Sequence, residues 1–381
     1  MDFAPHYIWQ AADWPQFRYA ADQIMPVLSQ ARVNQGILLG KAQSLALDSL
    51  PVTENEVWVS EAIATAEIEG EKLNLDAVRS SVARRLGLPN ASPVQAQRNV
   101  EGLLDVMADA SQNWDKPLTL DRLFSWQAAL FPTGYSGLHQ IKVGAFRETP
   151  IAVMSGPAGR EKVHYEAPAP DALMREMTRF LDWFEQSRAQ GGVGKEGLLR
   201  AGLAHLWFET IHPFEDGNGR VGRALVDLAL AQDTQRPTRL YGLSKQLARV
   251  RNDYYCQLEQ AQKGTMDVTP WLHWFVGQFN AACLDTVRIM EGSLEKAQFW
   301  ATHAGVSLSP AQTKTMKVLL DAGRGGFEGG MSTSKYASLN RVSTATASRD
   351  LAALTKAGLL AATGQGKATR YWINLPGWSI K

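Results

Sequence analysis

Several sequence features that usually indicate a particular class of protein are scarce in this 381-residue chain. It has only two cysteines, Cys256 and Cys283, which are too few for a disulfide framework and lack zinc-ligand spacing. Both stand in apolar helical patterns, so we expect two buried free thiols. Excess charge of one sign is also lacking, because the net charge is +1. Whole-chain electrostatics therefore indicate neither a nucleic-acid nor a membrane partner.

Long apolar runs are missing as well. No run reaches the ~18 residues that cross a bilayer, and no basic segment followed by an apolar one opens the chain. We therefore expect no signal peptide and a cytoplasmic location. The pattern Gly-x-x-x-x-Gly-Lys-Ser/Thr is also absent, which argues against an ordinary P-loop NTPase. A hydrophobic fraction of 45% and a charged fraction of 20% indicate a globular protein of two or three domains.

The most informative stretch runs from His212 to Arg223 and reads His-Pro-Phe-Glu-Asp-Gly-Asn-Gly-Arg-Val-Gly-Arg. Apolar residues at helical spacing predict one helix over residues 196–211 and a second that continues to about residue 231. Pro213 prevents the first helix from continuing past His212. The small residues 217–219 stand where the second helix should begin, so their backbone can turn sharply.

This arrangement favours phosphate chemistry. A helix N-terminus with successive free N–H groups attracts an anion, and Gly217–Gly219 would form such a site. Arg220 and Arg223 are three residues apart, so both guanidinium groups can reach the same anion. Asp216 offers a hard oxygen ligand for Mg²⁺. His212 supplies a titratable base at the mouth of the loop.

The run resembles, at every defining position, the signature of the Fic (filamentation induced by cAMP) family, His-Pro-Phe-x-Asp/Glu-Gly-Asn-Gly-Arg-x-x-Arg. The resemblance implies a mainly α fold with a Fic-type helical core and a β-hairpin flap. It also implies a protein adenylyltransferase that moves AMP from ATP, with Mg²⁺, to a Ser, Thr or Tyr hydroxyl of a target or of itself. His212 would be the catalytic base and Asp216 the metal ligand. The residues expected at the nucleotide are Gly217, Asn218, Gly219, Arg220, Val221, Gly222, Arg223 and Tyr255.

A second, shorter match lies upstream. Thr53 is a suitable N-cap, and the helix it would open spans residues 53–70. Its last turn, Thr65-Ala-Glu-Ile-Glu69-Gly70, resembles the Fic inhibitory motif Ser/Thr-x-x-x-Glu-Gly/Asn. That resemblance implies that Glu69 pairs with Arg223, removes it from the γ-phosphate and inhibits the enzyme.

We predict a helical N-terminal segment over residues 1–50, broken or kinked at Pro26, and a Fic domain over residues 51–295. Residues 148–165 read as a β-hairpin, the flap that would pair with an extended target segment. The paired tyrosines at 254 and 255 resemble the Fic segment that closes over the adenosine. The resemblance implies that Tyr255, or less readily Tyr254, stacks on adenine, with ordinary core packing as the alternative for both. His205 faces apolar neighbours and is expected to be a core histidine.

The chain changes character near its end. Residues 310–381 hold ten Lys or Arg but three Asp or Glu. Three helices followed by two short strands resemble a winged helix over residues 308–381. The helix from Ser343 would expose Thr344, Thr346, Ser348 and Arg349 to DNA, and Lys367 and Arg370 would meet phosphates. DNA and protein remain open as partners of this module.

Two other functions remain open. A Fic-type site can transfer a different phosphate-containing group, such as phosphate or phosphocholine. Alternatively, the Fic part only senses nucleotide for a DNA-binding regulator. The sequence does not identify the target protein, and a homodimer is compatible with the family resemblance.

Overall fold

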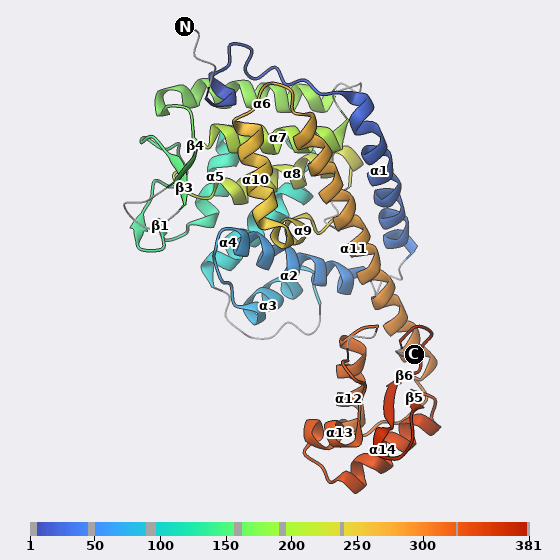
Figure 1. Ribbon diagram of the computed structural model, residues 1–381. Helices are drawn as coiled ribbons and strands as arrows, with labels where there is room; N and C mark the ends of the chain where they lie inside the picture. Colours follow the sequence, from blue (N-terminus) through green and yellow to red (C-terminus); the bar gives the residue numbers. More distant parts are fainter. Residues whose placement is uncertain are drawn as a thin grey trace. The chain divides into compact units, whose positions relative to one another are not determined.

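The computed structural model describes residues 6–44, 50–88, 97–155, 162–189, 196–236, 240–324 and 327–378. These residues form fourteen α-helices and three two-stranded antiparallel sheets, which confirms the mainly α prediction. The chain divides into two compact units, residues 1–287 and 288–381 (Figure 1). The boundary falls inside the long helix α11 (Thr269–Thr302). Among the described residues, no helix combines the length and apolar character that crossing a membrane requires.

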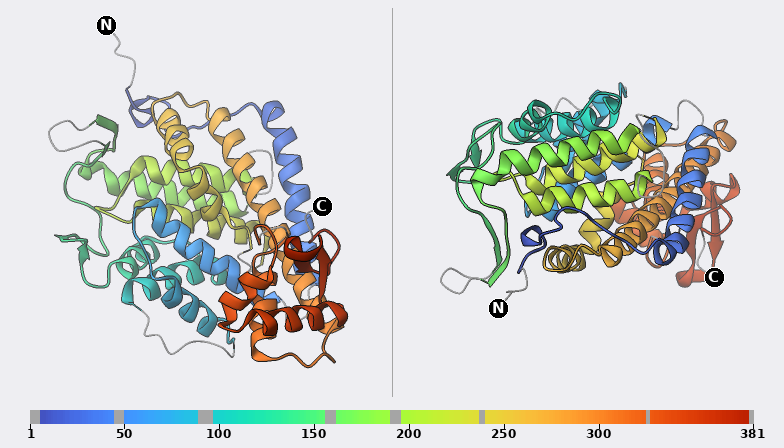
Figure 2. Two further views of the ribbon diagram at one scale, coloured as in Figure 1. Left: turned by 60° about the horizontal axis from the view of Figure 1, so that its bottom comes forward. Right: turned by 90° about the horizontal axis from the view of Figure 1, so that it is seen from above.

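Helices α7 and α8 form the centre of the N-terminal unit. Every residue of α7 is buried, because the helix is apolar on all sides and is covered all round. Figures 1 and 2 show this pair side by side among the other helices of the unit. The central pair is α7 (Gly197–Ile211) and α8 (Asn218–Thr234), and the helices that pack on it include α4 (Arg98–Gln112), α5 (Leu120–Leu130), α6 (Leu173–Ala189) and α10 (Arg251–Gln262).

The two helices that precede this core differ from the predictions. Helix α1 (Ala21–Ser44) continues through Pro26 without a break. Pro26 lies early in the helix, so its ring deprives only a first-turn carbonyl of its hydrogen bond. Helix α2 (Leu50–Ile68) begins three residues before Thr53, so the predicted cap was wrong. A proline in the first turn is compatible with this earlier start, because N–H groups there have no intrahelical acceptor.

Helix α2 packs against α3 (Leu75–Arg85), α8 and α9 (Leu243–Arg249). Residues 243–262 form two helices, α9 and α10, which separate at Val250. Tyr254 and Leu258 of α10 face inward, and Cys256 lies between them on the opposite side of the helix. Cys256 is therefore exposed, contrary to prediction, whereas Cys283 is buried as expected.

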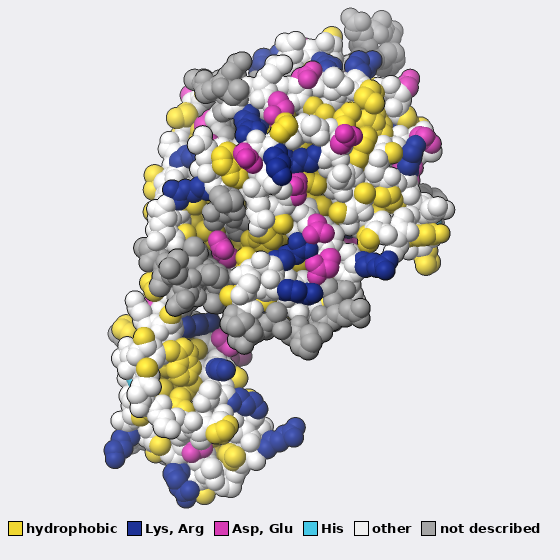
Figure 3. Space-filling view, turned by 180° about the vertical axis from the view of Figure 1, so that it is seen from behind, with side chains coloured by type: hydrophobic (Ala, Val, Ile, Leu, Met, Phe, Trp, Pro, Cys, Tyr) yellow, Lys and Arg dark blue, Asp and Glu magenta, His cyan; other side chains and the backbone are white. Residues whose placement is uncertain are grey.

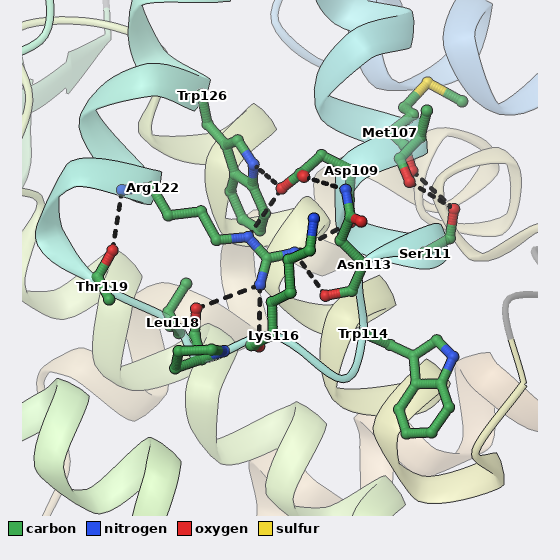
Figure 4. Close-up of polar contacts among 12 residues, drawn as sticks. Met107, Asp109, Ser111, Asn113, Trp114, Lys116, Leu118, Thr119, Arg122 and Trp126 are labelled. Atoms are coloured by element: carbon green, nitrogen blue, oxygen red, sulfur yellow. Dashed lines mark hydrogen bonds and ion pairs between the residues drawn. The ribbon is translucent and has the colours of Figure 1, made fainter.

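Arg122 joins α4 to α5 (Figure 4). Its Nε donates to a carboxylate oxygen of Asp109 at 2.7 Å, and Trp126 Nε1 donates to the same oxygen at 2.7 Å. The other guanidinium nitrogens donate to backbone carbonyls of the loop between the helices, at Asn113 and Lys116. Burial tends to raise the pKa of Asp109, but the hydrogen bonds from Arg122 and Trp126 lower it below its ordinary value. The carboxylate therefore stays charged and holds the connection in place.

Two short sheets belong to the N-terminal unit. Strands β1 (Tyr135–Ser136) and β2 (His139–Gln140) form a small hairpin. Strands β3 (Ala152–Ser155) and β4 (Lys162–Glu166) form the hairpin predicted over residues 148–165, with a register shift between Val153 and Met154. Its first strand starts at Ala152 rather than at residue 148, and its turn lies outside the described residues.

The C-terminal unit has the predicted order of three helices and two strands. Ser309 and Ser343 cap the first and third helices. A core that includes Met316, Tyr336 and Leu351 holds the helices together. Lys and Arg side chains project at several places from its visible face (Figure 3). The elements are α12 (Pro310–Asp321), α13 (Thr333–Asn340), α14 (Thr344–Lys356), β5 (Leu360–Thr363) and β6 (Arg370–Ile373). Its identity as a winged helix stays a prediction.

The close approach of α4 to α5 leads to a stability prediction. A Cβ at Gly102 would lie 1.8 Å from the carbonyl oxygen of Ala129. Gly102→Ala should therefore lower the free energy of unfolding by about 1–3 kcal/mol. Gly36→Ala in α1 is the matched control, because no atom lies within 4 Å of its Cβ. There alanine should stabilise by about 0.5–1 kcal/mol. Urea midpoints measure both changes, and midpoints that move in the same direction would contradict the prediction.

Candidate active site

His212 closes helix α7 in a conformation that few residues with side chains adopt. Its φ is 49° and its ψ is 61°, in the left-handed region. Pro213 disfavours a continued right-handed helix at this position. Two contacts hold the loop: Arg147 Nε donates to the carbonyl of His212 at 2.8 Å, and Arg147 N donates to the carbonyl of Pro213 at 3.0 Å.

Arg147 is a site residue that the sequence analysis missed. It is 2% exposed. Besides the His212 carbonyl, its guanidinium donates to the carbonyls of Thr149 at 3.0 Å and Pro168 at 2.6 Å. These two carbonyls flank the β3–β4 hairpin. One buried side chain thus ties both ends of the hairpin to the loop that carries His212.

The His212 ring is set up to accept a proton. Its Nδ1 lies 3.3 Å from the carbonyl oxygen of Glu209, which can only accept a hydrogen bond. The proton therefore belongs on Nδ1, and Nε2 keeps its lone pair. Burial is the main cause that lowers the pKa of His212 to about 4, helped by Arg147 and opposed by the contact with Glu209. The ring is consequently neutral near pH 7.

The start of α8 forms the expected turn. Gly217 is the N-cap, with φ 91°. A Cβ there would lie 2.9 Å from the Phe131 ring, so both conformation and space require glycine. Asn218 is buried, accepting from Phe214 N at 2.9 Å and donating to Phe214 O at 2.8 Å. Its side chain therefore braces the loop, which leaves backbone N–H groups as the means of contacting an anion.

Glu69, just after α2, lies directly over this helix N-terminus. A Cβ on Gly219 would be 2.2 Å from Glu69 Oε1. The same oxygen accepts from Arg223 Nη2 at 2.7 Å, while Arg223 Nε donates to Thr65 Oγ1 at 2.7 Å. Burial tends to raise the pKa of Glu69, but Arg223 outweighs it and lowers the pKa below its ordinary value. An ionised carboxylate therefore occupies the position that a phosphate would approach.

The first arginine of the motif, Arg220, has a partner of its own. Arg220 Nη1 lies 3.1 Å from both carboxylate oxygens of Glu71, which the sequence analysis did not single out. Its guanidinium also lies 4.8 Å from the centre of the Phe131 ring. The two arginines, expected to converge on one anion, are thus each held by a different glutamate.

Asp216 was expected to hold Mg²⁺. Its Oδ1 accepts from Gly217 N at 2.5 Å, and its Oδ2 accepts from the Ser136 hydroxyl. Its side chain is 38% exposed, so oxygen lone pairs still face solvent. Within the described residues, no three His, Cys, Asp or Glu side chains gather as a metal site. This donor set fits a magnesium ion that takes most of its ligands from phosphates and water.

These groups line one cavity of about 600 Å³. Its wall includes Glu69, His212, residues 217–219, the hairpin residues Val153 and Met154, and Tyr255. Of the other residues expected at the nucleotide, Arg220, Val221, Gly222 and Arg223 do not line it. Val221 is fully buried in the core. Arg220 and Arg223 are instead paired with Glu71 and Glu69.

The two tyrosines of α10 differ. Tyr254 is buried, and its hydroxyl lies 2.8 Å from His205 Nε2, so both residues belong to the core. Tyr255 is 37% exposed, and its hydroxyl donates to the carbonyl of Ile68 at 3.0 Å. Both tyrosines border the cavity, but Tyr254 is buried. The more exposed ring of Tyr255, beside the end of α2, is therefore the better placed to meet a ligand.

Parts of this chain are similar to known families and proteins. Residues 117–230 match the model of the Fic/DOC family, and residues 7–88 match that of a domain of unknown function, DUF4172. A protein adenylyltransferase Fic of Nematostella vectensis is 25% identical over 64% of this chain and 52% of its own length. A uridine 5'-monophosphate transferase of Xanthomonas campestris is 30% identical over 34% of this chain and 24% of its own length.

This chain thus spans about half the length of the first relative and about a quarter of the second. Among solved structures, a Fic family protein from Desulfovibrio desulfuricans matches with a TM-score of 0.51 and 20% identity, covering 91% of this chain and 96% of its own. This likeness shows a shared fold.

Proposed function

Given that the chain contains a Fic/DOC family domain, we propose that it is a protein adenylyltransferase that moves AMP from ATP to a hydroxyl of a target protein. One observation carries the proposal: a neutral imidazole and the N-terminus of α8 border the same cavity. A base and an anion site at this spacing suit the transfer of a phosphate-linked group to an alcohol.

In this reaction the triphosphate lies on the backbone N–H groups of residues 217–219. Arg220 and Arg223 neutralise its charge once Glu71 and Glu69 have released them. Nε2 of His212 takes the proton from the target hydroxyl while its oxygen forms a bond to the α-phosphorus. The bond from that phosphorus to the bridging oxygen breaks, and pyrophosphate leaves with the electron pair. Mg²⁺, held by Asp216, supplies charge neutralisation when bound.

The flap is the proposed docking surface for the target. Val153 and Met154 of β3 are exposed and line the cavity together with His212. An incoming extended segment can add to such a strand and bring its hydroxyl to the base. A second copy of this chain is one candidate target, which corresponds to self-modification.

Intact-mass analysis after incubation with ATP and Mg²⁺ tests the proposal. Self-modification by the mass of one AMP would support it. Addition of UMP, phosphate or phosphocholine from other donors, without addition of AMP, would instead support a different Fic-type transferase. The measurement therefore separates the proposal from its nearest alternative.

Glu71→Gln gives a prediction about nucleotide affinity. Glu71 is 41% exposed, so its pair with Arg220 contributes as a partly solvated ion pair. Its removal should tighten binding of ATP by about 2- to 5-fold, because Arg220 becomes free to meet phosphate. Isothermal titration calorimetry measures this. Glu67→Gln on the exposed side of α2 is the control, and equal affinities for both variants would contradict the prediction.

The C-terminal unit supports a second candidate function, binding to nucleic acid. Ten basic residues against three acidic ones in residues 310–381 favour a polyanionic partner. Thr344, Ser348 and Arg349 are exposed along α14. Binding of the full chain to duplex DNA should weaken steeply with salt and weaken further in Arg349→Ala. Binding that does not depend on Arg349 would argue against this surface.

A further inference from the structure

Helix α7 contains one acidic residue, Glu209, which the mechanism above leaves unused. Glu209 lies one turn before His212 and is 4% exposed. Its Oε1 has no hydrogen-bond partner among the described residues. Its Oε2 lies 3.7 Å from Nδ1 of His212, just beyond hydrogen-bond distance. A buried carboxyl oxygen without a partner is costly, so its presence calls for a physical reason.

Gly222 of α8 leaves the space for this acid. A Cβ there would lie 2.3 Å from Glu209 Oε1 and 3.2 Å from His205 Nδ1. A glycine inside a helix costs about 0.5–1 kcal/mol relative to alanine. Two locally unfavourable features therefore lie side by side one turn from the proposed base: a glycine inside a helix and a buried carboxyl oxygen without a partner.

The charged and titratable groups around Glu209 come from four elements. Glu69 follows α2, Arg223 lies on α8, and Tyr254 lies on α10. His205 shares α7 with Glu209, and His212 is the C-cap of that helix. Burial first, and then the negative charge of Glu69, raise the pKa of Glu209 to about 8, while Arg223 lowers it. Glu209 is therefore mostly neutral at pH 7 as long as Glu69 occupies the site.

We propose that Glu209 is a positioning residue for His212 and relays the state of Glu69 to it. When Glu69 leaves the site, Glu209 loses its proton to solvent, and its carboxylate accepts the Nδ1–H of His212. The proposal rests on the proposed transferase function. Within that reaction the proton of the target hydroxyl still goes to Nε2, and Glu209 takes no proton from the substrate.

The pairing changes the strength of the base. An adjacent carboxylate stabilises the imidazolium form, so the pKa of His212 moves up from about 4 toward its ordinary value. A more basic ring takes the hydroxyl proton more readily. The contact also fixes the tautomer and the ring orientation that direct Nε2 into the cavity. Glu69 thus suppresses transfer both at the arginines and at the base.

Removing Glu69 has two effects that shift the pKa of His212 in opposite directions, so the direction of the observed shift tests the proposal. Glu69 itself raises the pKa of His212 through its charge, as does Asp216, whereas Arg147 lowers it. If only direct charge effects operate, removing Glu69 lowers the pKa of His212. If Glu209 ionises and pairs, removing Glu69 raises that pKa. The direction of the change therefore decides between the two accounts.

Histidine NMR titration without nucleotide measures this directly. The His212 signal is identified by its loss in His212→Asn. We expect Glu69→Gly to raise the pKa of His212 by about 1–2 pH units and the added Glu209→Gln to abolish the rise. Glu215→Gln is the matched control: Glu215 also lies three residues from His212, but it accepts from Lys142 N. The rise should survive there. A fall in Glu69→Gly, or a rise that persists when Glu209→Gln is added, overturns the proposal.

The rate of AMP transfer gives a second readout. In Glu69→Gly, adding Glu209→Gln should lower the plateau rate on the order of 10-fold and move the rising limb of the pH profile to lower pH. A purely structural role of Glu209 would lower the rate without moving the limb. Glutamine has the shape of the neutral acid, and circular dichroism checks that the fold is retained. If no variant transfers AMP, the transferase proposal fails, while the titration still decides the role of Glu209.

Discussion

Replacing His212 with alanine is expected to lower AMP transfer by about 10²- to 10⁴-fold, the usual contribution of a general base. The ring makes one 3.3 Å contact to a backbone carbonyl and its side chain is 19% exposed, so the fold does not depend on it. The backbone of the loop stays anchored by Arg147. Transfer is followed with ATP labelled at the α-phosphate, and ATP binding is checked by calorimetry.

The control for this variant is His273→Ala, on the exposed side of α11 and outside the cavity lining. Its transfer rate should match that of the unchanged protein. Retained labelling in His212→Ala, with ATP still bound, would rule out His212 as the base. A loss of ATP binding together with transfer would instead show that the ring acts in binding.

Glu69→Gly should raise self-modification by about 5- to 150-fold, the range of a coupling free energy of 1–3 kcal/mol between two sites. The substitution removes the carboxylate from above Gly219 and frees Arg223 Nη2 for phosphate. It also leaves the 3% exposed Arg223 without its charged partner. The melting temperature of the nucleotide-free variant should therefore fall and recover when ATP binds.

Glu67→Gly provides the comparison, because it introduces the same residue into the last turn of α2 at an exposed position. This variant tests whether weakening the end of helix α2, with Glu69 still present, is enough to raise the rate of self-modification. An unchanged rate of self-modification in Glu69→Gly, or an equal rise in Glu67→Gly, would contradict autoinhibition by the Glu69 carboxylate.

The sequence predicts the centre of the fold well, because local rules govern it. Pro213 after the apolar run of α7 and the glycines before α8 restrict the backbone wherever they occur. The caps at Ser309 and Ser343 follow from the same kind of local hydrogen bonding. The start of α2 at Leu50 was missed because Thr53, taken by itself, is a suitable N-cap.

The residues that tune the site depend on tertiary contacts and were harder to predict. Arg147 binds only backbone carbonyls, so no motif accompanies it. Glu209 lies in a helix that is buried on every side. In such a helix the spacing of apolar residues does not set a polar face apart from the rest. Glu71 lies past the end of α2, and its partner is 149 residues away. For Glu209, one local signal was available: an acid one turn before the motif histidine, matched by a glycine at 222.

The hydrogen bonds that Arg147 makes to both ends of the β3–β4 hairpin bear on how the hairpin sequence, and with it the proposed choice of target, can change. Its acceptors are main-chain oxygens of residues 149, 168 and 212, which every amino acid possesses. The segment from 150 to 167 can accordingly be exchanged, residue by residue or as a whole, without taking away any of these acceptors. If the hairpin docks the target as proposed, a changed hairpin sequence can change the specificity. A lysine at 147 has a single ammonium in place of the planar guanidinium, so it would lose several of these contacts.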